Sequence, residues 1–541
     1  MLQFLDLFGF LSVILRASAL SLSAVVVGGV IFRFFVARGP LASGAQRVLI
    51  FSGFALAIVQ LFYVLANSEI LSASAGLPLV VVAGASYFIW GCSSAIAACT
   101  IGILAAKTGS RIGLLGILCA GIILSAEVAT SHAAARLDEQ TILIVATAAH
   151  QASAAAWIGG LPYLLLTLRS CDDVSQAASV CRRFSRLAVV SVSLLFAAGL
   201  VLSKLYIGDA SGLYGTTYGI MVAAKVLLFG LILLLGSLNF RLIRNRSGSD
   251  IRWLKQLRRI SEAEIGIGIT VILAAASLTS QPPAIDLTKN RVSLSTIAQR
   301  MAPQVPRMST PPLSTLSPST RELWKRQHSS NVDTIQTYIP GQEPSVPPTE
   351  GDIAWSEYNH HWAGLIVLVM GVLAAFARYR RFAYAKHWPL AFIGLAVFLL
   401  VRADPENWPL GPNGFWESFT SADVAQHRLF VLLIVLFAVF EWGVQTRRLT
   451  SRRAALVFPA ICCAGGALLL THTHAVTNIV EELLAELTHL PLALLAVLAG
   501  WARWLEIRVP MASRIPAKIT ACTWPISFVL IGVVLLLYRE A

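Results

Sequence analysis

Residues 218–239 read YGIMVAAKVLLFGLILLLGSLN, a stretch of 22 residues with one charged side chain, Lys225. As a helix this stretch is about 33 Å long, enough to cross the roughly 30 Å hydrocarbon layer of a bilayer. Similar stretches recur along the chain of 541 residues, of which 56% are apolar and only 13% are charged. A water-soluble protein of this length could not cover its surface with so few charges. The sequence therefore predicts an all-α, polytopic membrane protein.

About fourteen hydrophobic segments are expected to cross the membrane, eight before a long polar stretch and six after it. We therefore expect two transmembrane bundles, of eight and six helices. The approximate bounds of the segments are 8–32, 48–66, 77–105, 112–130, 141–168, 187–206, 218–239, 262–280, 362–377, 388–402, 428–445, 454–471, 489–503 and 521–538.

The loops between these segments alternate in charge. One set contains 28 Lys and Arg residues against 4 Asp and Glu residues, and it comprises the loops at 33–47, 107–111, 169–186, 241–259, 378–386, 447–453 and 503–518. The short loops of the other set, with the two termini, contain only Arg136 and Arg539 as basic residues. Because Lys and Arg stay cytoplasmic during insertion, we expect the basic set to be cytoplasmic and both termini periplasmic. The net charge of +14 is then a topology signal, and nucleic acid is not expected as a partner.

A polar stretch separates the two groups of hydrophobic segments. Residues 281–352 contain 11 of the 23 prolines and many Ser and Thr residues. This composition predicts an extended, largely disordered segment, and the alternation of the loops places it in the periplasm. We therefore expect a transmembrane bundle over 1–280, a periplasmic linker over 281–352 and a six-helix transmembrane bundle over 353–541.

Eight of the ten histidines lie at or just below the predicted helix ends that face the periplasm. A simple preference of histidine for membrane interfaces would place it at both faces equally. Imidazole is the commonest metal ligand, and helices that meet at one face can bring several imidazoles to one ion. The set therefore favours metal binding. The candidate metal ligands are His132, His150, His360, His361, His427, His472, His474 and His489.

The first bundle carries a series of more specific motifs. His150 is followed two helical turns later by Trp157, which begins a Trp-Ile-Gly-Gly element, and His132 ends the preceding segment. The adjacent glycines allow close approach of another helix. Further along are Arg-Phe-Ser-Arg-Leu at 183–187 and Tyr-Gly-Thr-Thr-Tyr-Gly at 214–219.

This series of motifs resembles the copper-resistance protein D family of bacterial inner-membrane proteins, best over 120–283. The resemblance implies copper handling, described for the family as moving copper from the periplasm across the inner membrane. It also implies that His132 and His150 occupy the family's histidine positions and that Trp157 belongs to its Trp-x-Gly-Gly element. The histidines of the second bundle are assigned from topology alone. The partners expected are copper ions, the lipid bilayer and a periplasmic copper-binding protein, and no enzymatic activity is expected.

Two further residues of the first bundle are expected to support the metal site. Glu127, inside the fourth segment, can accept a hydrogen bond from an imidazole that binds the metal. A buried acid paired with Arg16 or Lys225 explains Glu127 equally well. Trp157 lies on the same helical face as the histidine two turns before it.

Two other interpretations remain open. Histidines that face each other across a helical bundle also describe bis-His haem b in membrane electron-transfer proteins. In the first bundle the pair would be His132 and His150, and in the second it would be His427 and His489. Copper is preferred because the inner face has a single histidine, whereas di-haem cytochromes usually hold haems near both faces. The third interpretation is a membrane scaffold without metal, with the aromatic loop at 408–416 as its docking surface.

Overall fold

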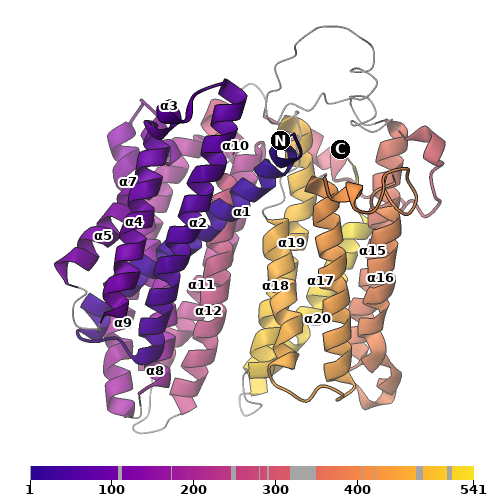
Figure 1. Cartoon of the computed structure of the whole chain (residues 1–541). Coiled ribbons are helices and arrows are strands. Elements are labelled where there is room, and N and C mark those ends of the chain that lie inside the picture. The colour runs from indigo at the N-terminus through magenta and orange to yellow at the C-terminus, as the bar shows by residue number, and fades with distance from the viewer. Residues whose placement is uncertain are drawn as a thin grey trace. The chain divides into compact units, whose positions relative to one another are not determined.

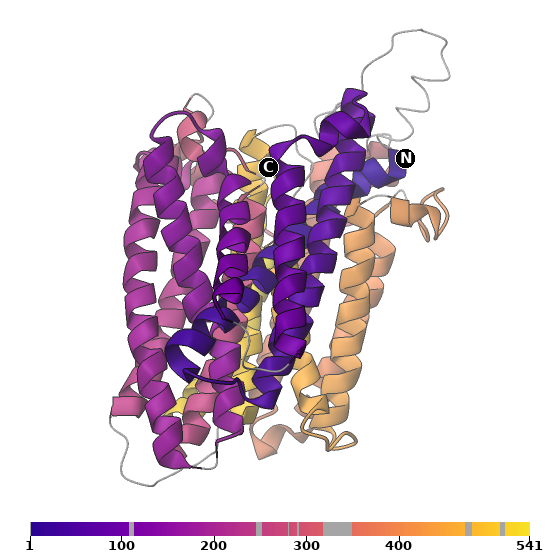
Figure 2. The same cartoon turned by 60° about the vertical axis from the view of Figure 1, so that its left-hand side comes forward.

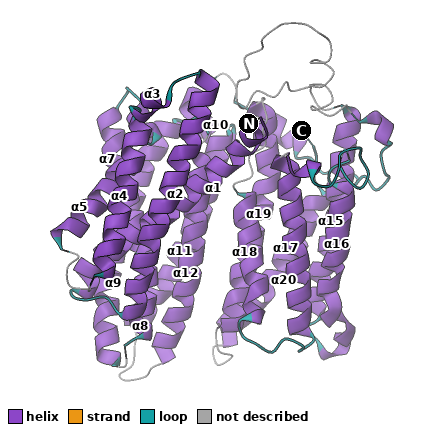
Figure 3. Cartoon of the chain, viewed as in Figure 1, coloured by secondary structure: helices purple, strands orange, loops and turns teal. Residues whose placement is uncertain are grey.

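The computed structural model is helical throughout its described regular structure (Figure 3). The chain forms two compact units. The N-terminal unit comprises Leu11–Leu213 and Met221–Thr288, and the C-terminal unit comprises Met1–Phe10, Tyr214–Ile220 and Lys289–Ala541. The residues that the structure describes are 2–107, 113–171, 173–244, 252–279, 281–288, 291–316, 349–405, 407–420, 422–470, 479–508 and 514–540.

The N-terminal unit is a bundle of long helices that lie side by side (Figure 1, Figure 2). Within it α2 packs against α4, α4 against α5, and α7 against α9. Its elements are α1 (Leu2–Phe32), η1 (Arg33–Ala37), α2 (Ser43–Ala75), α3 (Leu79–Ala83), α4 (Ser86–Ala106), α5 (Leu114–Ala129), α6 (His132–Ala135), α7 (Gln140–Ala154), η2 (Ala155–Gly159), α8 (Leu161–Arg169), α9 (Val174–Ile207), α10 (Ala210–Tyr214), α11 (Thr217–Arg244), α12 (Arg252–Leu278) and η3 (Ala284–Asp286). The first residues of α1 and α11 and the last residue of α10 are assigned to the C-terminal unit.

The C-terminal unit is a second helical bundle, in which α15 packs against α20 and α19 packs against both α18 and α20 (Figure 1). Its elements are α13 (Leu294–Arg300), η4 (Leu313–Thr315), α15 (Glu350–Phe376), η5 (Arg380–Leu390), α16 (Ala391–Arg402), η6 (Glu417–Thr420), α17 (Ala422–Gln445), η7 (Ala454–Leu456), α18 (Val457–Leu469), α19 (Ile479–Arg508) and α20 (Arg514–Leu536).

The helices are long enough and apolar enough for a multi-pass membrane protein, as the sequence predicts. Within the described part of the chain, 12 helices qualify as candidate membrane spans by length and composition. Each of the fourteen expected segments overlaps a helix, but the segments at 112–130 and 454–471 correspond to shorter apolar helices, Leu114–Ala129 and Ala454–Leu469. The count of fourteen, its division into eight and six, and the periplasmic position of the termini stay predictions.

Helix α1 contacts the π-helical turn η2 backbone to backbone. A Cβ atom on Gly159 would lie 1.8 Å from the carbonyl oxygen of Ala24, and one on Gly28 would lie 2.4 Å from that of Ala155. Any side chain at Gly159 would therefore push the two helices apart. The glycine of the Trp-Ile-Gly-Gly element thus allows the close helix approach that the sequence predicts.

Aromatic rings fill the core of the C-terminal unit. Phe392 and Phe437 are in edge-to-face contact, with ring centroids 4.3 Å apart, and Phe437 and Phe458 are similarly placed at 4.5 Å. This geometry adds to the stabilisation that burial of the rings provides. The aromatic members of this core are Trp388, Phe392, Phe437, Phe458, Trp524 and Phe528.

The Pro-rich segment expected at 281–352 is not an extended linker throughout. Its described first part contains the short helices η3, α13 and η4, and the backbone N–H of Arg307 donates to His361 Nδ1 at 2.7 Å. Helix α15 begins at Glu350, where Thr349 and Asp352 form a reciprocal capping box. Composition alone missed these contacts because they are made with side chains far along the chain. Residues 317–348 lie outside the described part.

Candidate metal-binding sites

The sequence predicts that His132 ends a long helix. In the structure it is instead the first residue of the short helix α6. Its ring makes a backbone hydrogen bond with Thr279, and its Nε2 is buried without a hydrogen-bond partner among the described residues. Burial lowers the pKa of the His132 imidazole from its ordinary value. Burial thus favours the neutral form of the ring, which is the form that coordinates metals.

His150 lies inside α7, against α9. Its ring makes a backbone hydrogen bond with Leu195 and lies 3.8 Å from the place a Cβ on Gly199 would take. Its Nδ1 is buried without a partner among the described residues, and the charge of Lys225 acts on the ring. The structure shows no ring contact or hydrogen bond that joins His150 to His132, so each imidazole has its own surroundings.

Glu127 lines a small polar cavity between α1, α2, α4 and α5. Ser23 and Arg16 are the groups that act on its carboxylate, and the Arg16 guanidinium lies 3.5 Å from the Thr130 hydroxyl. This arrangement favours the pairing with Arg16 over a hydrogen bond to His132. The cavity residues are Arg16, Ala19, Leu20, Ser23, Leu56, Gln60, Gly91, Ser94, Ala126, Glu127 and Thr130.

Trp157 lies in η2 and is almost completely buried. Its ring meets Phe229 of α11 edge to face, with centroids 6.1 Å apart. The observed contact of Trp157 is thus a packing contact.

A buried acid in α12 was missed by the sequence analysis. Glu264 accepts a hydrogen bond from the Asn239 amide at 3.0 Å, and the same amide lies 3.2 Å from the Ser261 hydroxyl. All three side chains are buried between α11 and α12. The signal was present, because Glu264 is a charged residue inside an expected membrane segment.

The histidines of the C-terminal unit lie deeper in their helices than the sequence suggests. Helices α15, α17 and α19 begin several residues before the expected segments. His360 and His489 are each ten residues from the first residue of their helix, and His427 is five. Polar first turns lower the average hydropathy, so hydropathy alone places a helix start too late. His472 and His474 lie outside the described residues.

Both ring nitrogens of His361 are occupied by hydrogen bonds. Nδ1 accepts from the Arg307 backbone N–H at 2.7 Å, and Nε2 donates to the Tyr538 carbonyl oxygen at 2.9 Å. The side chain is buried. His361 therefore ties α15 to two segments distant in sequence, and metal binding would break one of these hydrogen bonds.

His360, His427 and His489 form what we call the histidine group. The rings of His360 and His489 are 6.0 Å apart edge to face, and both contact Tyr538, whose ring stacks on His360 at 3.8 Å. His427 lies near enough to His360 for an electrostatic interaction between the two imidazoles. Three helices thus contribute imidazoles to the histidine group.

Hydrogen bonds at Nδ1 orient two members of the histidine group. His427 Nδ1 is 2.8 Å from Asp404 Oδ1, and His360 Nδ1 donates to the Ser356 carbonyl oxygen at 2.9 Å. A carboxylate or carbonyl at Nδ1 selects the tautomer whose lone pair is on Nε2, as is common for metal-binding histidine. Asp404 was not recognised from the sequence. In the described residues, no three His, Cys, Asp or Glu side chains already converge on one ion position.

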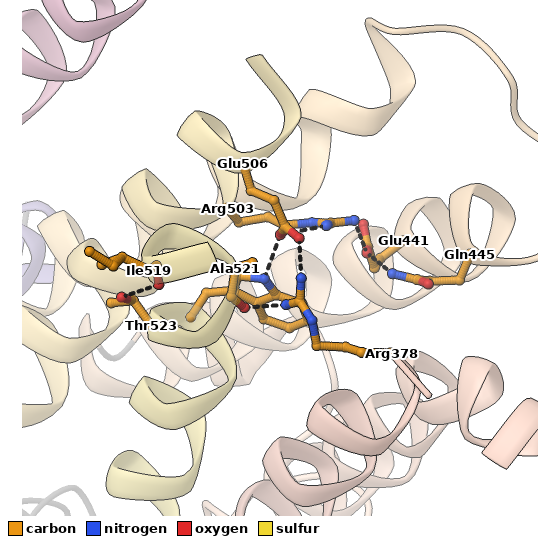
Figure 4. Close-up of polar contacts among 9 residues, drawn as sticks. Arg378, Glu441, Gln445, Arg503, Glu506, Ile519, Ala521 and Thr523 are labelled. Carbon is orange, nitrogen blue, oxygen red and sulfur yellow. Dashed lines mark hydrogen bonds and ion pairs between the residues drawn. The ribbon is translucent and has the colours of Figure 1, made fainter. Parts of the chain in front are cut away.

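A buried ionic network links three helices of the C-terminal unit, α17, α19 and α20, and the turn after α15 (Figure 4). Arg503 donates to Glu441 and to Glu506, each at 2.9 Å, and Arg378 donates to Glu506 at 2.6 Å. Trp524 donates to Glu506 at 2.7 Å. Glu441 is fully buried, so this network holds α17, α19 and α20 together through a charge that needs its partner.

Residues 178–278 match the family model described as "Copper resistance protein D". This match runs from α9 to the end of α12, and over these residues it confirms the resemblance expected from the sequence. The match begins after His132, His150 and Trp157, so it does not test their assignments.

A segment of 163 residues is 34% identical to "Copper transport protein CutJ" of Bacillus subtilis (strain 168). This segment covers 30% of the chain and 29% of CutJ, so the chain spans less than a third of the length of this relative. No solved structure matches the chain.

Proposed function

We propose that this protein binds copper through imidazole side chains at the periplasmic face of a bacterial inner membrane and passes the ion across that membrane. The observation that carries the proposal is the histidine group, in which His360 and His427 have the tautomer suited to coordination through Nε2. The match to the copper-resistance family model and the likeness to a copper transport protein support copper as the metal in this proposal. The proposal includes no catalysed reaction.

The N-terminal unit contributes His132 and His150 to the proposed path. Each has a buried ring nitrogen without a hydrogen-bond partner among the described residues. A buried polar atom without a partner costs free energy, about 1–3 kcal/mol, and a bound ion would recover part of that cost. Imidazole nitrogens suit Cu(II), the oxidised form that an oxidising periplasm supplies. We expect a periplasmic copper-binding protein to deliver the ion.

Copper bound by the purified protein tests the proposal. We expect bound copper to fall in a His360→Ala/His427→Ala double variant, and copper tolerance to change in a strain that carries it. A His132→Ala/His150→Ala variant should show the same two effects if the N-terminal unit contributes. His387→Ala is the matched control, because His387 accepts a hydrogen bond from Trp442 and belongs to neither set. Wild-type copper content in both double variants would refute the proposed site.

An absorption spectrum of the same sample tests the haem alternative. Neither comparison names a haem protein, so this alternative gains no support from them. We expect no Soret band and no stoichiometric iron. A Soret band lost in the histidine variants would instead make the histidines axial ligands.

A further inference from the structure

A charged cleft of about 350 Å³ lies at the end of the C-terminal unit. Three segments form its wall: the Pro-rich segment, the first turns of α15 and the residues after α20. It contains no sulfur ligand, so its chemistry suits a hard or intermediate cation better than Cu(I). The lining residues are Arg300, Gln304, Arg307, Glu350, Ile353, Glu357, Arg539 and Glu540.

Specific hydrogen bonds hold the Pro-rich wall of the cleft in place. The Arg539 guanidinium donates to the Gln299 carbonyl at 2.9 Å. Arg307 pairs with Glu357 at 3.4 Å, in addition to its backbone bond to α15. Trp362 donates to the carbonyl of Met308, the residue after Arg307, at 3.1 Å. The cleft is therefore bounded by fixed contacts of the chain with itself.

Glu540 connects this cleft to the histidine group. Its Oε2 accepts a hydrogen bond from the Tyr538 hydroxyl at 2.7 Å and another from the Ser356 hydroxyl. Tyr538 stacks on His360, and the carbonyl of Ser356 accepts from the same imidazole. Glu540 thus lines the cleft, and Tyr538 and Ser356 contact both Glu540 and His360.

Three Arg and three Glu side chains line the cleft, so each carboxylate has to be compared by its own partners. The Arg539 guanidinium, next to Glu540 in sequence, donates to the Gln299 carbonyl. The carboxylate of Glu357 is matched by Arg307, whereas the two groups that hydrogen-bond to Glu540 are neutral hydroxyls. Hydroxyl donors orient a carboxylate without cancelling its charge. A carboxylate held in this way beside imidazoles offers mixed oxygen and nitrogen ligands, which suit Cu(II).

We propose that this cleft is the entrance through which a divalent copper ion reaches the histidine group, and that Glu540 is the carboxylate that first receives it. This inference rests on the proposed function, because it requires copper to bind at His360. The ion exchanges part of its water shell for the Glu540 carboxylate and then passes to the imidazoles.

Stopped-flow tryptophan fluorescence, with free Cu(II) as the probe, tests this entrance on the full chain in detergent. Glu540→Gln keeps an acceptor oxygen for Tyr538 but removes the charge. We expect it to slow copper binding about tenfold, because a local charge at the mouth of a cleft raises the association rate. Glu350→Gln is the matched control: it removes the same charge from the exposed rim of the same cleft, and we expect less than about a twofold change.

The outcomes separate the entrance from the function. If His360→Ala loses copper but Glu540→Gln binds it at the wild-type rate, the entrance is refuted and the proposed function stands. Equal slowing by Glu540→Gln and Glu350→Gln also refutes it, because the effect would then come from net charge alone. Wild-type copper binding in His360→Ala refutes the histidine group as the site, and the entrance with it. A monodisperse elution profile of each variant shows that the fold is retained.

Discussion

His360 and His361 are neighbours in sequence, yet their rings have different surroundings. His361 is hydrogen-bonded at both nitrogens, which is the environment of a structural histidine. His360 is fixed at Nδ1 and stacks on Tyr538 within the histidine group. Successive residues of a helix are turned by about 100° from one another, so they meet different neighbours. The sequence predicts both residues as ligands, and we propose His360 because its Nε2 is not used in the hydrogen bond to Ser356.

Asp404 is the residue we expect to matter most for the affinity of the histidine group. Its carboxylate holds the ring of His427 at 2.8 Å. Asp404→Asn removes the charge that strengthens this imidazole as a ligand, and losses of such partners typically cost about 10- to 100-fold in metal affinity. Copper affinity is measured by competition with a chelator. Asp173→Asn is the control, because Asp173 only caps α9. Affinity within about twofold of wild type for Asp404→Asn would contradict the expected role.

From the buried network around Glu441 we predict that Arg503→Met destabilises the protein more than Glu441→Gln does. Arg503→Met leaves Glu441 buried without its cation, and we expect a loss of about 3–5 kcal/mol in the free energy of unfolding. Glu441→Gln should cost less, because Arg503 keeps its pair with Glu506. Unfolding midpoints in detergent check the order.

An exposed pair supplies the control for this order. Arg169 pairs with Glu262 at 3.1 Å, and about half of the Arg169 side chain is exposed. Arg169→Met should cost only about 0–1 kcal/mol, because solvent screens the pair. If Arg503→Met were no worse than Arg169→Met, the network would not stabilise the bundle.

At the scale of the elements, the sequence predicted the close helix contact at Gly159 but not the π-helical turn η2 that contains this residue. The Trp-Ile-Gly-Gly element was expected in a continuous helix, but Ala155–Gly159 form a wider turn. Such turns often occur at functional sites. Here the turn brings Gly159 against α1 and directs Trp157 toward α11.

Gly159→Ala is predicted to weaken the contact between α1 and η2. The added methyl group would lie 1.8 Å from the Ala24 carbonyl oxygen, so the helices must separate, and overpacking of this kind costs about 1–3 kcal/mol. Thermal unfolding in detergent measures the loss. Gly230→Ala in α11 is the control, since no atom lies within 4 Å of the new Cβ. Its helix propensity should improve slightly. Equal midpoints for the two variants would contradict the proposed contact.

At the scale of the whole molecule, the predicted topology can be tested at two described loops. Gly414→Cys lies in a loop expected to be periplasmic, and Ser451→Cys lies in one expected to be cytoplasmic. Both positions are exposed. In a Cys522→Ser background, an impermeant maleimide should label Gly414→Cys in intact spheroplasts and label Ser451→Cys only after lysis. The reverse result would place the histidine group on the cytoplasmic side.

The sequence by itself determined that this is an all-helical membrane protein, because spans of apolar residues with few charges have one stable arrangement in a bilayer. It also gave the copper-resistance segment, since that rests on motifs along the chain. Only the tertiary structure decided which ring nitrogens already have partners, that Glu127 lies with Arg16, and that Asp404 and Glu540 adjoin the histidine group. These depend on contacts between residues far apart in sequence, which hydropathy and spacing do not encode.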